Sequence, residues 1–234
     1  MSELLFTPQQ ITAIERTRAD VSALHQLLVR YDLVVWTGGN ISGRVPGTDL
    51  FVIKPSGVDY PDLTAESMVV CTLDGQKVDG FSGSERAPSS DTASHAYVYR
   101  NMPQVSGVVH THSDYATAWA ARAEPIPCVL TAQADEFGGE VPVGPLALIG
   151  DEQIGKGVVE TLDGHRSRAV LMQNHGVFTI GKNPKEAVKA AVMVEDVART
   201  AHYARLGGEP IPLPSEDVDK LFDRYQNVYG QHKH

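Results

Sequence analysis

Cysteine and long apolar runs are scarce in this sequence of 234 residues. Its two cysteines, Cys71 and Cys128, lie in apolar, strand-like segments. We interpret them as reduced core thiols of a cytoplasmic protein, and a disulfide between them has no particular support. No apolar run approaches the roughly 20 residues of a transmembrane helix. Residues 1–6 also lack the basic start of a signal peptide. We therefore expect no membrane partner.

Positive charge is also in short supply. The chain has 20 Lys and Arg against 29 Asp and Glu, which gives a formal net charge of −9. A protein of this sign is not an expected partner of nucleic acid, and an anionic small substrate would need a local cationic pocket. Internal repeats and low-complexity linkers are absent from the sequence. Together with a hydrophobic content of 42%, this favours a single domain over residues 1–234.

Two histidines end an apolar stretch in the middle of the chain. Residues 107–112 read Gly-Val-Val-His-Thr-His, which predicts a buried strand. Alternate side chains of a strand share a face, so His110 and His112 project together and could chelate a transition metal. This spacing alone more often joins two unrelated polar residues. However, a second apolar run leads to His175, and Asp91 opens a helix-like segment. Three imidazoles and a carboxylate predict a metal site.

Helical patterns alternate with strand patterns along the chain. Thr7 and Gln10 form a capping box, and Asn183-Pro184 opens a long helix that ends at two glycines. Helices are predicted over residues 8–30, 90–101, 113–123, 151–162, 184–206 and 215–225. Strands are predicted over residues 33–36, 50–54, 68–73, 76–78, 107–112, 127–130, 141–143, 146–149, 169–173 and 177–180, with a loop over 131–139. Because several neighbouring strands resemble hairpins, we expect an α/β fold, an αβα sandwich with a central mixed, mainly antiparallel β-sheet flanked by helices.

Three turns carry backbone N–H and hydroxyl groups that could bind an anion. The last of them also stands at a predicted helix N-terminus, where free N–H groups favour phosphate. Lys54 adds a positive charge beside the second turn. Each feature also has an ordinary explanation, since glycines form turns and serines cap helices. The three turns are Gly38-Gly39-Asn40, Ser56-Gly57 and Ser89-Ser90.

Together these motifs resemble those of the class II aldolase/adducin-head family. The strings that carry the resemblance are residues 39–40, 54–57, 88–91, 110–112 and 174–176, and the likeness extends over about residues 21–231. Within the family, the chain is similar to L-ribulose-5-phosphate 4-epimerases. The resemblance implies an αβα sandwich and a divalent ion, usually Zn²⁺, with Mn²⁺ or Co²⁺ as substitutes. It also implies a C4 homotetramer with active sites between neighbouring subunits.

The resemblance also implies roles for individual residues. Asp91 stands where the family's aldolases carry a Glu acid/base and its epimerases carry an Asp that approaches the metal. Asp135 matches one acid/base. Tyr229 matches the opposing one, on a tail of about residues 215–231 that reaches an adjacent subunit. Gln133 departs from the His that is common at its position. The residues expected to hold substrate and its phosphate are Asn40, Lys54, Ser56, Gly57, Ser89, Ser90, Thr131 and Arg224, the last being equally explicable as a surface residue.

The implied reaction is the metal-dependent interconversion of L-ribulose 5-phosphate and D-xylulose 5-phosphate. One alternative is a sugar-phosphate aldolase of the fuculose or rhamnulose phosphate type, or a related acid-sugar phosphate decarboxylase. Another is a non-catalytic adducin-head-like interaction module, against which the three candidate ligands His110, His112 and His175 argue. The other helix and loop histidines, among them His25 and His95, are interpreted as surface or core-edge residues.

Overall fold

The N-terminal helix begins where its capping signals predict. In the computed structural model, which describes residues 6–228, α1 (Pro8–Arg30) starts after Thr7. The Thr7 hydroxyl accepts the Gln10 backbone N–H, and the Gln10 side chain accepts the Thr7 N–H. Ile14, Val21 and Leu28 recur every seventh residue on the buried face of this helix.

Seven strands form one sheet in the order β3-β2-β1-β4-β7-β6-β5. All neighbouring pairs are antiparallel except β5 and β6, which are parallel. The predicted mixed, mainly antiparallel sheet is therefore confirmed. The strands are β1 (Asn40–Arg44), β2 (Leu50–Ile53), β3 (Val69–Thr72), β4 (Gly107–Thr111), β5 (Val143–Gly144), β6 (Ala169–Met172) and β7 (Gly176–Gly181).

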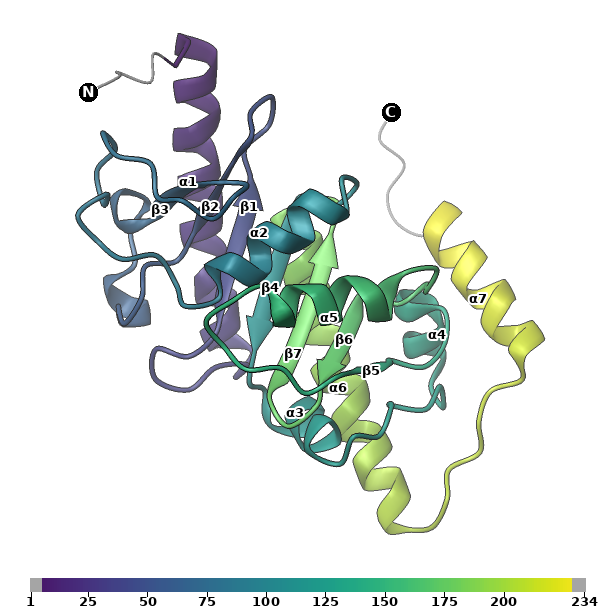
Figure 1. The fold of residues 1–234 in the computed structure, drawn as a ribbon. Coiled ribbons are helices and arrows are strands. Elements are labelled where there is room, and N and C mark those ends of the chain that lie inside the picture. Colours follow the sequence, from purple (N-terminus) through teal and green to yellow (C-terminus); the bar gives the residue numbers. More distant parts are fainter. Residues whose placement is uncertain (1–5, 229–234) are drawn as a thin grey trace.

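Helices cover both faces of this sheet (Figure 1). Val52 and Val109 pack in one apolar cluster with α1 and α6 (Pro184–Leu206). Their neighbours Phe51 and Val108 point the other way, into a cluster with α2 (Thr92–Asn101) and α5 (Gln153–Leu162). α3 (Asp114–Ala121) packs against α6. The expected αβα sandwich is confirmed.

Two further helices pack on each other at one end of the molecule, α4 (Thr131–Phe137) and α7 (Ser215–Asn227). The loop predicted over residues 131–139 is therefore wrong. Ala134 and Phe137, one helical turn apart, are fully buried. Tertiary packing stabilises a short helix here that periodicity over so few residues does not reveal. Two 3₁₀ helices, η1 (Tyr60–Asp62) and η2 (Ala65–Ser67), precede β3.

Three predicted strands are wrong. Residues 33–36 form an irregular segment, because Trp36 adopts φ of +56° and its side chain, 84% exposed, finds no strand partner. Residues 127–130 are irregular as well, and Cys128 accepts a backbone hydrogen bond from Leu213, after α6, at 3.0 Å. Residues 146–149 lie outside the sheet, and all but the partly buried Ala147 are exposed, with Leu148 78% exposed. An apolar run predicts a strand only where a neighbouring strand supplies its hydrogen bonds.

Two smaller differences from the prediction concern the start of α2 and one short strand. α2 begins after Asp91 rather than at Ser89 or Ser90. The return strand over residues 76–78 is reduced to one bridge between Cys71 and Lys77. Cys71 and Cys128 are free thiols, as expected.

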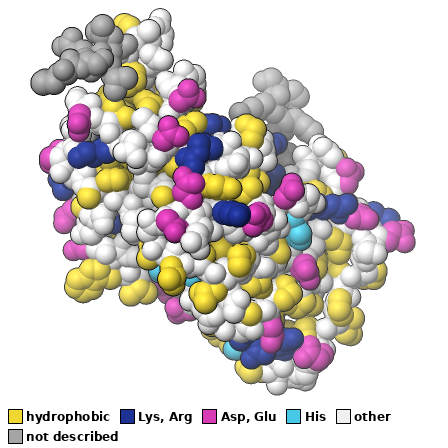
Figure 2. Space-filling model, in the orientation of Figure 1, with side chains coloured by type: hydrophobic (Ala, Val, Ile, Leu, Met, Phe, Trp, Pro, Cys, Tyr) yellow, Lys and Arg dark blue, Asp and Glu magenta, His cyan; other side chains and the backbone are white. Residues whose placement is uncertain are grey.

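No helix within residues 6–228 has the length and apolar character to span a membrane. Figure 2 shows acidic and basic side chains interspersed over one face of the molecule.

Candidate metal centre

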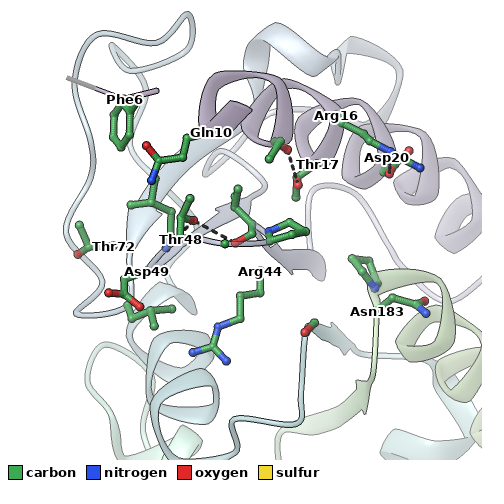
Figure 3. Close-up of a pocket in the computed structure, with 18 of the residues that line it drawn as sticks. Phe6, Gln10, Arg16, Thr17, Asp20, Arg44, Thr48, Asp49, Thr72 and Asn183 are labelled. Atoms are coloured by element: carbon green, nitrogen blue, oxygen red, sulfur yellow. Dashed lines mark hydrogen bonds and ion pairs between the residues drawn. The ribbon is translucent and has the colours of Figure 1, made fainter. Parts of the chain in front are cut away.

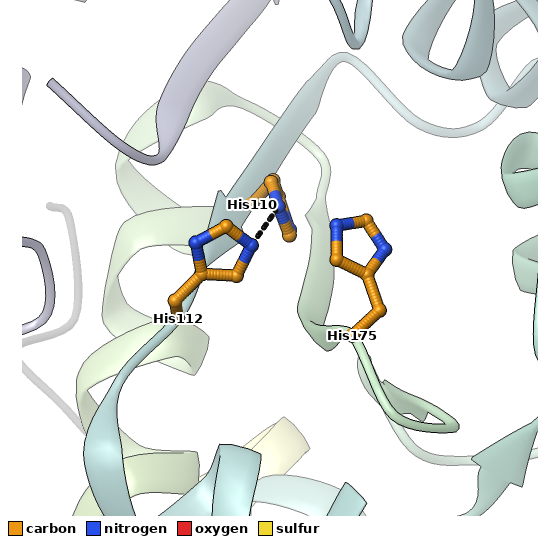
Figure 4. A group of neighbouring side chains, drawn as sticks. All are labelled: His110, His112 and His175. Carbon is orange, nitrogen blue, oxygen red and sulfur yellow. Dashed lines mark hydrogen bonds between the residues drawn. The ribbon is translucent and has the colours of Figure 1, made fainter. Parts of the chain in front are cut away.

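The end of β4 and one turn bring three imidazoles together. His110 lies on β4, where it pairs with Asn40 of β1 and Phe178 of β7. His112 follows the end of β4, and His175 lies in the turn between β6 and β7. One ring nitrogen from each histidine lies within 4.8 Å of the others. The three rings face one another in Figure 4. The predicted convergence of these histidines is therefore observed.

The most buried ring, His110, is oriented by its neighbours. Its Nδ1 lies 2.9 Å from the Val177 carbonyl oxygen, so Nδ1 carries the proton and donates it. Its Nε2 lies 3.0 Å from His112 Nε2, and these two atoms share one proton that a cation would displace. The Phe178 ring stacks on His110 with centroids 4.3 Å apart. These contacts direct a nitrogen lone pair of His110 toward the other two rings.

Burial keeps the three rings uncharged. It lowers the pKa of His110 to about 3, against the opposing effect of the Asp91 carboxylate. Burial also lowers the pKa of His112 and of His175. Neutral imidazole is the form that binds a metal, so the group needs no deprotonation of an imidazolium at neutral pH.

Close packing around the rings requires a glycine. A Cβ atom on Gly176 would lie 2.6 Å from His112 Cδ2 and 2.6 Å from the Thr111 carbonyl oxygen. Asn174, two residues earlier, adopts φ of +56°, which Asn tolerates better than most residues. The string Asn-His-Gly therefore forms a tight turn that places His175 beside the end of β4.

Asp91 lies close to the imidazoles but outside the group of three. Asn40 Nδ2 donates to Asp91 Oδ2 at 2.7 Å and to Ser89 Oγ at 3.1 Å. Asp91 Oδ1 is buried and has no hydrogen-bond partner among the described residues. Burial raises the pKa of Asp91, but the electrostatic effects of His110 and His95 and the hydrogen bond from Asn40 outweigh burial and lower it. Three neutral imidazoles beside an ionised, partly unpaired carboxylate form a donor set that suits a divalent transition metal.

The three predicted anion-binding turns meet beside Asp91. Ser56 N–H donates to the Ala87 carbonyl at 2.9 Å, and Ser89 N–H donates to the Lys54 carbonyl at 3.0 Å. Lys54 is only 2% exposed, and its Nζ contacts the carbonyl oxygens of Thr37 and Pro55 at 3.2 and 3.4 Å. Burial lowers the pKa of Lys54. Its ammonium therefore ties two turns together, while Ser56, Gly57 and Ser90 are exposed.

A second set of predicted residues lies on α4 and α7. Asp135 is half-buried, and its Oδ1 has no hydrogen-bond partner among the described residues. Thr131 begins α4, and Arg224 is exposed on α7. Asp135 does not join the imidazole group within this chain. Tyr229 lies outside the described residues. Gln133, which stands where the resemblance predicts His, is buried and donates to the Ile126 carbonyl at 2.9 Å.

The interpretation of His25 and His95 as surface or core-edge histidines is wrong, because both are fully buried. His25 links α1 to β1, since its Nδ1 contacts the Val21 carbonyl and its Nε2 accepts the Ile41 N–H. Phe178 and Glu195 were also missed. Glu195 accepts backbone N–H groups from the first turn of α3, those of Tyr115 and Ala116. Only the four-residue spacing of His95 from Asp91 was visible in the sequence.

A broad hollow of about 1630 Å³ lies elsewhere, at the opposite end of β1 (Figure 3). Arg44, Thr48 and Asp49 line it, together with part of α1. Asn40 begins β1 and Arg44 ends it, so the strand separates this hollow from the imidazoles. None of the predicted site residues that fall within 6–228 lines the hollow.

Comparison with known proteins identifies relatives of the whole domain. The family described as Class II Aldolase and Adducin N-terminal domain matches residues 19–202. Curated L-ribulose-5-phosphate 4-epimerases UlaF from Salmonella paratyphi B and Salmonella typhi are each 38% identical to this chain over 234 residues. Each alignment covers 93% of this chain and 100% of the relative.

Solved structures of aldolases share the fold. An L-fuculose 1-phosphate aldolase superposes with a TM-score of 0.83 at 29% identity, covering 90% of this chain and 96% of that one. The L-fuculose-1-phosphate aldolase from Thermus thermophilus gives a TM-score of 0.69 at 27% identity, covering 83% of this chain and 98% of that one. The likeness therefore extends over nearly the full length of each protein.

Proposed function

Since the chain belongs to the class II aldolase and adducin N-terminal domain family, we propose that it is a metal-dependent L-ribulose-5-phosphate 4-epimerase. The reaction interconverts L-ribulose 5-phosphate and D-xylulose 5-phosphate. The single observation that carries the proposal is the group of three neutral imidazoles beside the ionised Asp91. The 38% identity to curated epimerases over 93% of the chain supports this substrate class.

His110, His112 and His175 would hold a divalent ion, and Asp91 is the proposed fourth ligand. Zn²⁺ is the ion that we expect, and Mn²⁺ or Co²⁺ suits the same donors. When bound, the ion supplies Lewis-acid stabilisation of the charge that develops when a carbon–carbon bond near a ketone breaks. The Asn40 amide holds Asp91 Oδ2, so the carboxylate keeps a defined orientation.

The position of the inverted carbon requires bond cleavage. Carbon 4 of a 2-ketopentose is not adjacent to the carbonyl, so its hydrogen is not acidic. Breaking and re-forming the bond between carbons 3 and 4, with rotation of the aldehyde fragment, inverts the centre. Each direction needs a group that moves the proton of the carbon-4 hydroxyl. We assign this role to Asp135 on one face of the aldehyde and to Tyr229 on the other.

The turns around Asp91 are the proposed phosphate site. Ser56, Gly57, Ser89 and Ser90 offer hydroxyl and backbone N–H donors there, and Asn40 contacts Ser89. Holding the phosphate keeps the aldehyde fragment from leaving before the bond re-forms. Lys54 contributes its charge from the buried position described above. Thr131 and Arg224 are assigned to the opposite wall of the site, contributed by α4 and α7.

A neighbouring copy of the chain completes this proposal. Asp135 is not one of the three grouped ligands, and we propose that a C4 homotetramer brings the tail of about residues 215–231, which carries Tyr229, to the next subunit's metal. Residues 1–234 act as one domain in this arrangement. We further propose a cytoplasmic location, which the two free thiols support.

The test is the product formed from L-ribulose 5-phosphate by zinc-loaded protein. We expect D-xylulose 5-phosphate, identified by its stereochemistry, and no accumulation of free glycolaldehyde phosphate. Release of the aldehyde as the main product would instead favour an aldolase, which the 0.83 TM-score to an L-fuculose 1-phosphate aldolase keeps as the second candidate. Carbon dioxide release from an acid-sugar phosphate would identify a decarboxylase. Purified protein with no affinity for divalent ions would favour a non-catalytic interaction module.

A further inference from the structure

Three buried side chains form a hydrogen-bonded row behind Asp91. The Tyr99 hydroxyl lies 2.7 Å from Ser42 Oγ, and Ser42 Oγ lies 2.7 Å from His95 Nδ1. His95 and Tyr99 are one turn apart on α2, and Ser42 lies on β1. All three side chains are fully buried. A buried polar row of this kind is costly unless its protons are ordered.

The hydrogen bonds of this row run in one direction, from Tyr99 through Ser42 to His95. A backbone hydrogen bond from Val108 reaches the Tyr99 oxygen and favours its ionised form, so there the oxygen accepts. Within residues 6–228, Ser42 Oγ is then the acceptor available to the Tyr99 proton. Ser42 must donate its one proton to His95 Nδ1. Because His95 Nδ1 accepts this proton, the N–H of the imidazole ring lies on Nε2.

The His95 ring also lies near Asp91. His95 Nε2 and Asp91 Oδ1 are both buried, and neither has a hydrogen-bond partner among the described residues. Each acts on the other, since Asp91 raises the pKa of His95 against burial, and His95 contributes to lowering that of Asp91. The four-residue spacing on α2 places them on one helix face, with the His95 N–H donating to the Asp91 carbonyl at 3.0 Å. A buried donor and a buried carboxylate oxygen, neither of them hydrogen-bonded, thus belong to residues one helical turn apart.

His95 also supports the imidazole group through an aromatic ring. It packs edge-on against Phe178, with centroids 6.0 Å apart. Phe178 in turn stacks on the His110 ring. It also packs edge-on against the His175 ring, with ring centroids 6.2 Å apart. Removing the His95 ring would therefore loosen both the carboxylate and one wall of the ligand group.

We propose that His95 is a positioning residue of the metal centre, fixed as the Nε2–H tautomer by Tyr99 and Ser42 so that it orients the Asp91 carboxylate toward the metal. This inference rests on the metal site of the proposed function but not on its sugar substrate. Groups that orient metal ligands typically contribute about 10- to 100-fold to metal affinity.

The tautomer is tested directly by nuclear magnetic resonance. In zinc-loaded protein with ¹⁵N-labelled histidine, we expect the His95 ring to show a protonated Nε2 and an unprotonated Nδ1. The spectrum of a His95→Gln variant assigns the signals by their loss. A proton on Nδ1, or a doubly protonated ring, would overturn the proposed direction of the row.

Zinc affinity, measured by competition with a chelator, tests the role. We expect His95→Leu to lower the affinity roughly 10- to 100-fold, and His95→Gln, which keeps a donor near the Nε2 position, to restore most of it. Tyr99→Phe removes only the first hydroxyl of the row, so the loss should be a few-fold. If His95→Leu does not fold, Tyr99→Phe and His95→Gln still decide the question.

His25→Gln is the matched control, because His25 is as deeply buried as His95. Both ring nitrogens of His25 are hydrogen-bonded, and they link α1 to β1 rather than contacting Asp91. We expect it to change thermal stability and leave zinc affinity unaltered. Wild-type affinity in a folded His95→Leu variant, or an equal loss in His25→Gln, would refute the role of His95. Because no substrate is present, a protein that binds zinc as expected but does not epimerise would contradict only the proposed function.

Discussion

The two regions that carry the proposed chemistry are built in different ways. Strand register and backbone hydrogen bonds of the sheet position the imidazole group. His110 donates to the Val177 carbonyl and stacks on the Phe178 ring. In contrast, α7 contacts α4 through the Gln226 side-chain amide, which donates to the Asp135 carbonyl at 3.4 Å, and Val218 is the only buried residue that α7 contains. Rigid strands suit a metal site that demands fixed geometry. A loosely packed helix suits a segment that completes a neighbouring site.

Loss of a ligand should have the largest effect. We expect His112→Asn to abolish stoichiometric zinc binding and to reduce epimerase turnover by at least about 10³-fold, because metal-stabilised charge has no substitute in the site. Metal content by mass spectrometry and a coupled assay measure this. His202→Asn on α6, outside the imidazole group, is the control and should bind zinc normally. Retained zinc and turnover in His112→Asn would remove this residue from the metal site.

The tail should affect chemistry without affecting the metal. We expect Tyr229→Phe to slow turnover about 10²-fold, the typical contribution of one acid/base group, at unchanged zinc content. Tyr203→Phe provides the control, since the Tyr203 hydroxyl contacts that of Tyr115 on the surface. An unchanged rate would exclude Tyr229 from the mechanism, and lost zinc would show that the two regions are not separable.

The contact that secures α4 should matter more than surface ion pairs of α7. Lys189 Nζ lies 2.7 Å from Glu136 Oε2, and Glu136 is almost fully buried. Lys189 also lies over the Tyr225 ring, 4.8 Å from its centroid. We expect Lys189→Met to lower the free energy of unfolding by about 1–3 kcal/mol, because it leaves a buried carboxylate unpaired.

Denaturant unfolding measures this change, and zinc content should stay normal. Lys220→Met, which breaks an exposed pair with Glu216 on α7, is the matched control and should cost no more than about 0.5 kcal/mol. Equal effects of the two substitutions would argue that Glu136 is not anchored by Lys189.

Acid should act first on the sheet region, where the buried histidines lie. Burial lowers the pKa of His25 from 6.5 to about 3. Below pH 6.5 the unfolded chain binds a proton at His25 that the folded chain does not, so stability falls as the pH falls through this window. The slope from this residue approaches about 1.4 kcal/mol per pH unit. His25→Gln should flatten the decline in metal-free protein, measured by thermal unfolding between pH 6.5 and about 4.5; an unchanged slope would contradict it.

Local signals predicted the elements that they specify directly. The capping box at Thr7 and Gln10, the Asn183 cap and the alternating strand patterns lead to the correct helices and sheet type. The errors share a cause, since the segments over 33–36 and 127–130 have strand composition but no strand neighbour. The seven-residue α4 forms because α6 and α7 cover it. Composition does not record which partner a segment meets.

By itself, the sequence predicted the donor groups that could form a metal site in this protein. The two-residue period of a strand places His110 and His112 on one side. The Asn-His-Gly turn and the predicted anion-binding turns can be recognised from short stretches of sequence. Only the tertiary structure decided that His175 meets the other two histidines, that Lys54 is buried against backbone carbonyls, and that His95 lies behind Asp91. The reason is physical: residue type and local period depend on neighbours within a few positions, whereas burial and convergence depend on strand order and on helices far along the chain.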